Sequence, residues 1–336
     1  MWSIVRYRTF SEQAKPLNDW QKILSQALNS TATLSKHLKT PQSEIDPSPQ
    51  FPLRLPIPML DRIQSTHAND PVLRQFLPTQ QEQQDSVGFV HDPLEEARFS
   101  PLNGLLHKYP GRALIIMTSV CAVHCRYCFR RHYPYAEQVP DSQQWAKLLD
   151  HIRQDTSINE IILSGGDPLS LGDDKLRQRC LSLSTIPQIK TLRIHSRLPV
   201  IIPERITPAL LQWMEPFPLP IVLVTHINHP NEINPAVIEA MHLLQKAGVH
   251  LLNQSVLLKQ VNDNTSTLKS LSERLFSAHI LPYYLHQLDT VSGTAHFSVD
   301  DQRARTLIDE LRACLPGYLV PKLVRETPGD LAKMPV

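Results

Sequence analysis

Short apolar runs that recur at a regular interval constrain the fold of this chain more than any other feature of its sequence. From residue 113 onward such runs, often β-branched, predict buried strands at residues 113–117, 160–163, 191–195, 221–226, 250–257 and 280–285. After the first, longer gap their starts lie roughly thirty residues apart, which is the length of one strand–helix unit. Helix-like segments lie between and after them, at residues 142–154, 175–183, 208–213, 235–247, 267–278 and 300–314. This alternation predicts an α/β fold, with a parallel sheet covered by helices.

Polar residues follow the predicted strands at their carboxyl ends. They are the cysteine-bearing loop after residue 117, Ser164-Gly165-Gly166-Asp167, His195 with Arg197, His226 with Asn228, Asn253 with Gln254, and Asp289. In parallel α/β folds ligands bind at that edge of the sheet. The alternation fits an open doubly wound sheet as well as a full or partial barrel. The sequence therefore predicts a ligand site at the carboxyl edge of the sheet in either architecture.

Three cysteines stand close together directly after the first predicted strand, in Cys121-Ala-Val-His-Cys125-Arg-Tyr-Cys128. Thiols at this spacing point to bound iron or zinc. A disulfide with a spare thiol is disfavoured, because the chain has only five cysteines in 336 residues and no secretory signal. A structural zinc site completed by His124 or His132 is the main alternative, although no second C-x2-C or H-x3-H pair accompanies it. Three protein ligands leave one metal position open to another ligand, which implies a catalytic site and not a structural one.

Composition and charge restrict the classes of partner. Hydrophobic residues make up 41% of the chain and charged residues 20%, as in a globular protein that buries a core. A net charge of +2, with scattered lysine and arginine, gives no basis for nucleic-acid binding. No apolar run is long enough to cross a bilayer, and charges interrupt the first residues. We therefore expect a cytoplasmic protein with no nucleic-acid or membrane partner.

Residues 1–100 show little strand pattern, and we expect a helical, loop-rich extension there. Asn18-Asp19 would cap a helix that runs to Leu28, residues 35–38 and 70–77 are short helix candidates, and the proline-rich residues 47–58 would connect them. The expected division is an extension at 1–100, a core at 101–317 and a C-terminal segment at 318–336. Within the last segment, residues 318–324 are one further strand candidate.

The segment Ser164-Gly165-Gly166-Asp167-Pro168 has two interpretations. A tight turn explains it on its own. Its glycines also allow another group to approach the backbone closely, and its aspartate supplies a hydrogen-bond acceptor. Placed one strand after the cysteine loop, it completes a pattern that resembles the radical S-adenosylmethionine (SAM) enzymes. The resemblance implies a partial (β/α)6 barrel in which Cys121, Cys125 and Cys128 bind a [4Fe-4S] cluster. It also implies that SAM chelates the fourth iron, and that Gly165, Gly166 and Asp167 bind the amino group of SAM.

Further motifs narrow the resemblance to the lysine 2,3-aminomutase family. They agree in order and spacing from about residue 92 to the end, and they cover residues 104–112, 128–131, 193–199, 253–263, 274–289 and 325–333. In that family a lysine seven residues after an acidic residue forms the internal aldimine with pyridoxal phosphate (PLP). The corresponding pair here is Glu326 and Lys333, where the family has an aspartate and a more glycine-rich spacer.

The resemblance also implies roles for other residues. Arg130 would bind the substrate carboxylate, for which a guanidinium group is suited. Asp289 and Glu326 would bind a distal ammonium group, so a basic amino acid fits and glutamate is repelled. The positions expected to contact PLP, besides Lys333, are Lys108, Arg112 and Gln254, the first two near its phosphate.

The activity implied by the resemblance is an isomerase that converts L-α-lysine to (R)-β-lysine by moving the amino group from C2 to C3. It would use the [4Fe-4S] cluster, SAM, PLP and an external electron donor. Because the sequence ends at Val336 without the cysteine-bearing extension of larger members, it resembles the branch that supplies β-lysine for modification of translation elongation factor P by a lysyl-transferring enzyme. Two alternatives stay open, a radical SAM enzyme of another reaction type without PLP and a non-enzymatic zinc-binding module. Cys180 and Cys314 receive no functional role.

Overall fold

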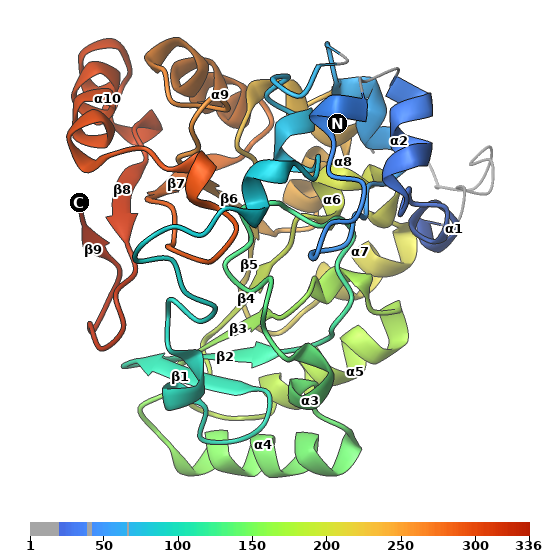
Figure 1. Ribbon diagram of the computed structural model, residues 1–336. Helices are drawn as coiled ribbons and strands as arrows, with labels where there is room; N and C mark the ends of the chain where they lie inside the picture. The colour runs from blue at the N-terminus through green and yellow to red at the C-terminus, as the bar shows by residue number, and fades with distance from the viewer. Residues whose placement is uncertain (1–19, 39–41, 66) are drawn as a thin grey trace, which may run out of the picture.

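The computed structural model describes residues 20–38, 42–65 and 67–336 of the chain (Figure 1). One sheet has the order β1-β2-β3-β4-β5-β6-β7-β8-β9, so every strand pairs with its neighbour in sequence. Strands β2 to β8 are parallel, whereas β1 and β9 pair antiparallel at the two edges. The strands are β1 (Leu105–Tyr109), β2 (Arg112–Ile116), β3 (Glu160–Ser164), β4 (Thr191–His195), β5 (Ile221–Thr225), β6 (His250–Val256), β7 (Leu281–His286), β8 (Lys322–Arg325) and β9 (Met334–Pro335).

Several helices of the core begin at polar residues that cap them. The helices of the described residues are α1 (Trp20–Ser25), α2 (Thr31–Leu38), α3 (Tyr135–Gln138), α4 (Ser142–Gln154), α5 (Asp173–Ser184), α6 (Leu198–Ile201), α7 (Pro208–Met214), α8 (Pro235–Lys246), α9 (Thr265–Ser277) and α10 (Asp301–Cys314). Asp141 accepts a hydrogen bond from Gln144 N at the start of α4, and Asn234 and Asn264 cap α8 and α9 in the same way. These caps explain why the predicted helix starts agree with the observed ones to within two residues.

Strand order decides between the architectures that the alternation left open. A doubly wound sheet requires a reversal of strand order, with helices on both faces. Here each parallel strand lies beside the next one along the chain, and right-handed crossovers put the connecting helices on one face. Accordingly α8 contacts β6, α9 contacts β7 and α10 contacts β8 (Figure 1). The predicted fold class is confirmed, with β2 to β7 as the six predicted parallel strands of an open barrel and β8 as a seventh beside them.

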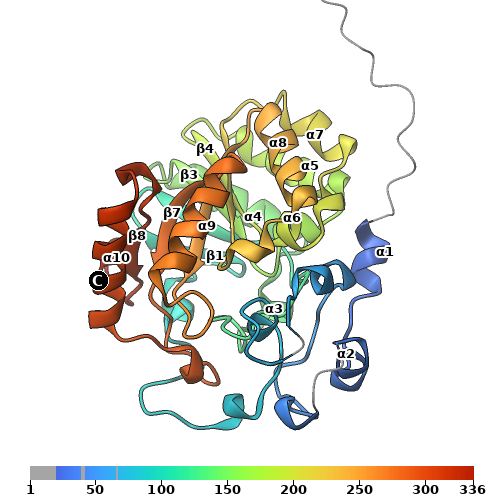
Figure 2. The same cartoon turned by 90° about the horizontal axis from the view of Figure 1, so that it is seen from above.

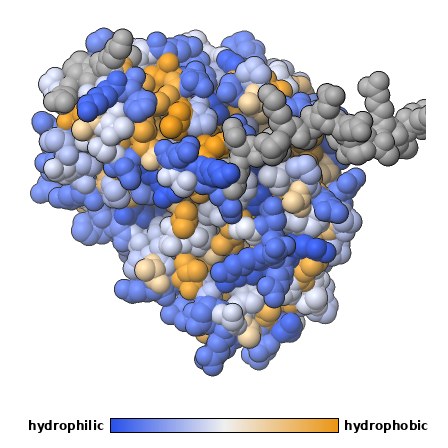
Figure 3. Space-filling view, turned by 90° about the vertical axis from the view of Figure 1, so that its right-hand side faces the viewer, coloured by the Kyte–Doolittle hydropathy of each residue, from blue (hydrophilic) through white to orange (hydrophobic). Residues whose placement is uncertain are grey.

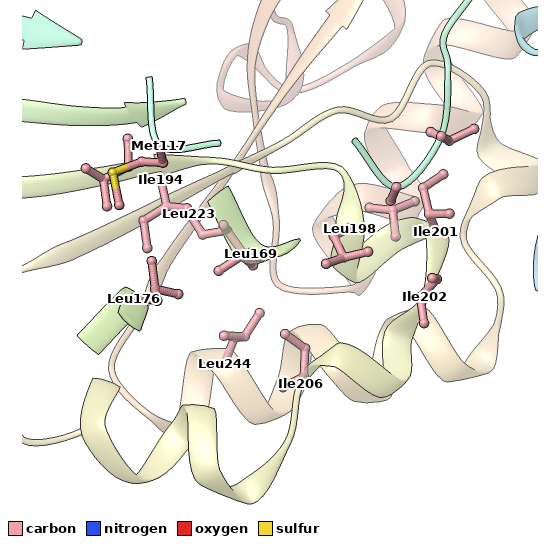
Figure 4. Packing of buried hydrophobic residues seen from close by; sticks show 14 of the residues in the cluster. Met117, Leu169, Leu176, Ile194, Leu198, Ile201, Ile202, Ile206, Leu223 and Leu244 are labelled. Carbon is pink, nitrogen blue, oxygen red and sulfur yellow. The ribbon is translucent and has the colours of Figure 1, made fainter. Parts of the chain in front are cut away.

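The largest group of buried apolar side chains lies between the sheet and its helices. Figure 4 shows Ile194 of β4 and Leu223 of β5 on the sheet side, with Leu176 of α5 and Leu244 of α8 opposite. All four side chains are excluded from solvent. Burial of such a side chain stabilises a fold by about 1.5–3 kcal/mol. This packing fixes the sheet and leaves its other face available for a site.

Residues 20–100 pack against the same core as the sheet. Trp20, Leu34, Leu55 and Phe76 belong to the buried cluster that also contains Ile115 of β2. In Figure 2 this segment lies along the lower side of the molecule, with α1 and α2 at the right. Most of it is irregular or forms short 3-10 helices. The segment therefore has no separate core among the described residues.

The structure differs from the sequence-based expectations in several short segments. Residues 70–77 form only a short 3-10 helix, Leu73–Gln75, because Pro78 prevents the turn from continuing. The strand expected at 318–324 begins at Lys322, since residues 317–319 form a 3-10 helix. Strands β1 and β9 were not predicted. The cap expected at Asn18-Asp19 lies outside the described residues, and the helix that follows it, α1, ends at Ser25 before Leu28.

Hydrophilic side chains predominate on the face shown in Figure 3, where apolar side chains form small groups. Within the part of the chain that the structure describes, no helix combines the length and hydrophobicity needed to span a bilayer.

Candidate active site

The inner face of the sheet and its carboxyl edge surround one cavity. Alternate residues of the strands point into it, such as Arg112 and Leu114 of β2 and Ile162 and Ser164 of β3. Its wall includes every residue that the sequence analysis assigned to the site, namely Lys108, Arg112, Cys121, Cys125, Cys128, Arg130, Gly165, Gly166, Asp167, Gln254, Asp289, Glu326 and Lys333. Motifs that are far apart in the sequence therefore meet in one place.

The loop with the three cysteines follows β2 and is held by the segment that precedes the sheet. Arg126 donates to both carboxylate oxygens of Glu82, and its Nη1 atom donates to the carbonyl of Phe51 at 2.9 Å. Arg131 donates to the same carboxylate at 2.7 Å. The Arg126 and Glu82 side chains are 0% and 6% exposed, so solvent screens this pair little. The loop is thus fixed through residues other than its cysteines.

The thiols of Cys121 and Cys128 are in surroundings that oppose their ionisation. Burial raises the pKa of Cys121, and the neighbouring Cys128 raises it further. Burial likewise raises the pKa of Cys128 to about 12. Nearby guanidinium groups oppose these shifts only in part, Arg54 at Cys121 and Arg130 at Cys128. Nη1 of Arg197 lies 2.8 Å from Sγ of Cys125. Thiolates at these positions require additional positive charge.

Two glycines let the loop after β3 lie directly against the cysteine loop. Gly165 has a φ of +115°, which favours glycine, and a Cβ atom there would lie 2.8 Å from the carbonyl of Thr118. A Cβ atom on Gly166 would lie 2.4 Å from the carbonyl of Val120. The backbone groups of Gly166 and Asp167 donate to those same two carbonyls at 2.8 Å each. The glycines are therefore required for contact between two loops that line the cavity.

Asp167 connects this loop to the end of β4. Its Oδ1 atom accepts hydrogen bonds from Leu169 N at 3.0 Å and Ser196 Oγ at 2.7 Å. Its Oδ2 atom accepts from the backbone of Arg197 at 2.8 Å and of Leu198 at 2.9 Å. Burial raises the pKa of Asp167, although all four hydrogen bonds favour its ionised form. The carboxyl group holds the shape of the loops from β3 and β4 where they meet the cysteine loop.

An acidic side chain and two lysines meet at the other end of the cavity. Glu326 Oε1 lies 2.7 Å from Lys108 Nζ, and Glu326 Oε2 lies 3.0 Å from Lys333 Nζ. Burial raises the pKa of Glu326, but the two ammonium groups outweigh it and lower the pKa below its ordinary value. Asp289 lies nearby, and burial together with the charge of Glu326 raises its pKa to about 7. This end of the cavity has an acceptor for a cation whenever Lys333 withdraws.

Neutral histidines line the wall between these two ends. Burial lowers the pKa of His226 to about 3, and it lowers the pKa of His195 and His286 as well. The Nε2 atom of His226 lies 2.8 Å from Nε2 of Gln254, and that of His286 lies 3.5 Å from Nζ of Lys333. These histidines therefore supply hydrogen-bonding groups near Lys333 without adding positive charge.

Comparison with known proteins accounts for a cavity that has a three-cysteine loop and a buried lysine–glutamate pair. The family model described as "Radical SAM superfamily" matches residues 115–271. The L-lysine 2,3-aminomutase of Escherichia coli (strain K12) is 50% identical over 286 residues, which is 85% of this chain and 83% of that protein. The proteins of the same name from Haemophilus influenzae and Clostridium subterminale are 44% and 37% identical. They cover 93% and 98% of this chain, and the matches span 94% and 81% of their own lengths.

The chain belongs to the lysine 2,3-aminomutase family of radical SAM proteins. Membership in the aminomutase family implies a [4Fe-4S] cluster, SAM and PLP as cofactors. The residues of the cavity fit such groups. Cys121, Cys125 and Cys128 all line the cavity, although no three Cys, His, Asp or Glu side chains of the described residues already surround one point. Bound iron would supply the positive charge that keeps a coordinating thiol deprotonated.

The opposite wall fits the anionic cofactor of an aminomutase. Lys333 presents a primary amine to the cavity. The guanidinium group of Arg112 lies over the ring of Tyr109, 4.7 Å from its centroid, and has no ion-pair partner among residues 20–38, 42–65 and 67–336. Arg112 can therefore neutralise a phosphate, whereas Lys108 is engaged by Glu326.

Several cavity residues of this aminomutase family member had no assigned role from sequence. His286 is the last residue of β7 and follows the rule that pointed to the other strand ends, so that rule could have found it. Glu96 lies in the 3-10 helix Glu96–Phe99, in a segment without periodic pattern, and nothing in its sequence context indicated a place in the site.

Proposed function

We propose that this protein is a PLP-dependent enzyme that converts L-α-lysine to (R)-β-lysine. Its relatives are named L-lysine 2,3-aminomutases, which supports the reaction type. The observation that carries the proposal is that the Lys333 amine and the three-cysteine loop line one cavity. A radical generated at the cysteine loop and an amino group held at Lys333 would then act on the same molecule.

The proposed roles follow the two ends of the cavity. Cys121, Cys125 and Cys128 would hold the [4Fe-4S] cluster, with Gly165, Gly166 and Asp167 forming the SAM site beside it. Lys333 would bind PLP covalently, while Arg112, Lys108 and Gln254 line its site. Arg130 would bind the carboxylate of the substrate, and Asp289 with Glu326 its distal ammonium group.

When bound, the cluster and SAM supply a radical that removes hydrogen from C3, and PLP carries the migrating nitrogen. The residues of the chain position these reactants. Lys333 Nζ donates a hydrogen bond to Glu326 Oε2 at 3.0 Å. When Lys333 binds PLP, that oxygen would become available to the ammonium group of the substrate. Lys108 would keep Glu326 ionised throughout, because it occupies the other carboxylate oxygen.

The same charges would select the substrate. A distal ammonium group between Asp289 and Glu326 would favour ionisation of Asp289, whose pKa of about 7 reflects burial next to another carboxylate. A substrate with a distal carboxylate would add a third negative charge there. Lysine should therefore be turned over and glutamate should not.

We further propose that the β-lysine serves the modification of translation elongation factor P in the cytoplasm, with a lysyl-transferring enzyme and an external electron donor as functional partners. The resemblance of the sequence to that branch of the family supports this. In cells whose own copy is deleted, elongation factor P should carry the added mass only when the wild-type chain is supplied. The same added mass with Lys333→Ala would contradict the link.

The decisive test is anaerobic purification with iron, sulfide and PLP analysis, followed by borohydride reduction and peptide mapping. PLP reduced onto Lys333, and turnover of lysine to (R)-β-lysine that Lys333→Ala abolishes, would support the proposal. Lys246→Ala, an exposed lysine on α8, is the matched control. A cluster without PLP would favour a radical SAM enzyme of another reaction type.

Zinc without sulfide would favour the zinc-binding module instead. Such a module would use the cysteines of the same loop, so iron and sulfide analysis separates it from a cluster-containing enzyme.

A further inference from the structure

The guanidinium group of Arg130 is held by Glu96 before any substrate arrives. Nε and Nη2 of Arg130 each lie 2.7 Å from one carboxylate oxygen of Glu96, so the pair is bidentate. The two side chains are 7% and 5% exposed. A third contact runs from Nη1 to Ser164 Oγ at 3.2 Å. Arg130 is thus fixed in a desolvated position on the cavity wall.

The hydrogen-bond donors of Arg130 show which edge of the group stays available. A guanidinium group has five N–H donors in one plane. Glu96 takes the Nε donor and one donor of Nη2, and Ser164 takes one donor of Nη1. One donor on Nη1 and one on Nη2 remain, and the Nη2 donor lies on the end-on edge, away from Glu96. A carboxylate binds such an edge through two parallel hydrogen bonds.

Two aromatic rings pack against the guanidinium group of Arg130 and help to fix its position. The ring centroid of Phe129 lies 4.8 Å from Cζ of Arg130, and that of Tyr133 lies 5.8 Å away. The backbone of Glu96 is itself fixed, since its N–H donates to Asp92 Oδ1 at 3.2 Å. A buried charge that loses its partner is strongly destabilised, so the ion pair also keeps the guanidinium inside the wall.

We propose that Glu96 is a positioning residue that binds one edge of Arg130 so that the other edge receives the substrate carboxylate. This inference rests on the proposed function, in which Arg130 binds that carboxylate. It makes the segment before residue 100 a part of substrate recognition, because the 3-10 helix Glu96–Phe99 belongs to it. Glu96 acts through Arg130 and need not touch the substrate.

The test compares Glu96→Gln with Glu95→Gln in the holoenzyme that contains cluster, SAM and PLP. Glu95 is the adjacent residue; it is half-exposed and pairs with Arg98, so its substitution controls for loss of a nearby charge. The measured quantities are the dissociation constants of L-lysine and of L-lysinamide, followed by PLP absorbance, together with KM and kcat. L-Lysinamide keeps both amino groups and lacks the carboxylate.

Glu96→Gln should weaken binding of L-lysine by about tenfold or more, the range expected when a supporting hydrogen-bond partner is lost. Binding of L-lysinamide should change by less than about twofold, KM should rise more than kcat falls, and Glu95→Gln should match wild type. In an Arg130→Lys background, Glu96→Gln should add little further loss, because both residues act in one contact. Glu96→Asp, whose shorter side chain cannot keep both hydrogen bonds, should show the same selective loss if Glu96→Gln does not fold.

Equal weakening of both ligands would overturn the proposal, since it would indicate a purely structural role. Unchanged or tighter L-lysine binding in Glu96→Gln would also overturn it, because Glu96 would then be a bystander or a competitor for Arg130. If wild type and Glu95→Gln fail to bind or convert lysine at all, the proposed function itself is wrong. These results are distinguishable.

Discussion

Lys108 on β1 donates to Glu326 with its Nζ atom 2.7 Å from Oε1, and this ion pair joins the first strand of the sheet to the segment after β8. Both side chains are largely buried, at 8% and 13% exposure. The pair therefore connects one edge of the open barrel to the other across the cavity.

Replacing Lys108 by methionine should remove this connection while keeping the length of the side chain. Glu326 would lose one of its two cationic partners in a desolvated place, and we expect a loss of about 1–3 kcal/mol in the free energy of unfolding. Urea denaturation of the apoprotein measures it, with Lys246→Met on the surface of α8 as the control. Equal midpoints for the two variants would show that the ion pair contributes no stability.

The stability of the ligand-free protein should depend on pH through Asp289. Burial and the charge of Glu326 raise the pKa of Asp289 from 3.8 to about 7 in the folded state. Such a carboxyl group stabilises the fold fully below its unfolded pKa, and this contribution is lost as pH rises through the folded pKa. Asp289→Asn should therefore be more stable than wild type at pH 8, by about 1 kcal/mol or more, and the advantage should shrink at pH 5. Thermal unfolding of both proteins at the two pH values measures this difference. A difference in stability that does not depend on pH would contradict the raised pKa of Asp289.

Glu82→Gln should loosen the cysteine loop. Glu82 pairs with both Arg126 and Arg131, and removal of one partner from a buried ion pair costs about 3 kcal/mol or more. Hydrogen exchange of residues 121–131 should accelerate, and iron content after reconstitution should fall. Glu137→Gln, an exposed substitution in α3, should leave both quantities at their wild-type values. Protection of the loop equal to wild type in Glu82→Gln would show that other contacts suffice.

Gly166→Ala should force two cavity loops apart. The added Cβ atom would lie 2.4 Å from the carbonyl oxygen of Val120, a backbone atom that cannot move alone. Overpacking of this kind costs about 1–3 kcal/mol. Calorimetry should show a lower melting temperature than for Gly172→Ala, where an added Cβ atom meets nothing within 4 Å. If the two alanine variants melt together, the contact between the loops is more adaptable than the structure indicates.

The sequence predicted the parallel strands and their helices well because both have strong periodic patterns and defined ends. Strand β4 was predicted at its observed bounds, and α4 begins where Asp141 caps it. Strand β1 was missed since His107 and Lys108 break its apolar pattern, although Pro110-Gly111 is a turn signal between two pairing strands. Strand β9 has two residues, too few for any pattern. The division at residues 100 and 317 stays a prediction.

The position of the site and the types of its residues could be predicted from the sequence. The ion pairs between those residues and their partners could not. The strand-end rule and the motifs brought thirteen residues to one cavity, and all of them line it. The partner of Arg130 could not be predicted, because Glu96 lies in an irregular segment whose place depends on tertiary packing. The contact between Lys108 and Glu326 likewise depends on how the two edges of the open sheet approach each other.

The ion pairs that hold the cysteine loop bear on how the holoenzyme is assembled. Glu82 and the carbonyls of Phe51 and Gln75 hold Arg126, so the loop takes its shape through contacts in which no cysteine participates. In small zinc domains, by contrast, the metal drives folding and the apoprotein is unfolded. We therefore expect the backbone of the cysteine loop to be ordered in the apoprotein, before the iron–sulfur cluster binds. Loss of the cluster to oxygen should accordingly leave a folded protein that can be repaired instead of degraded.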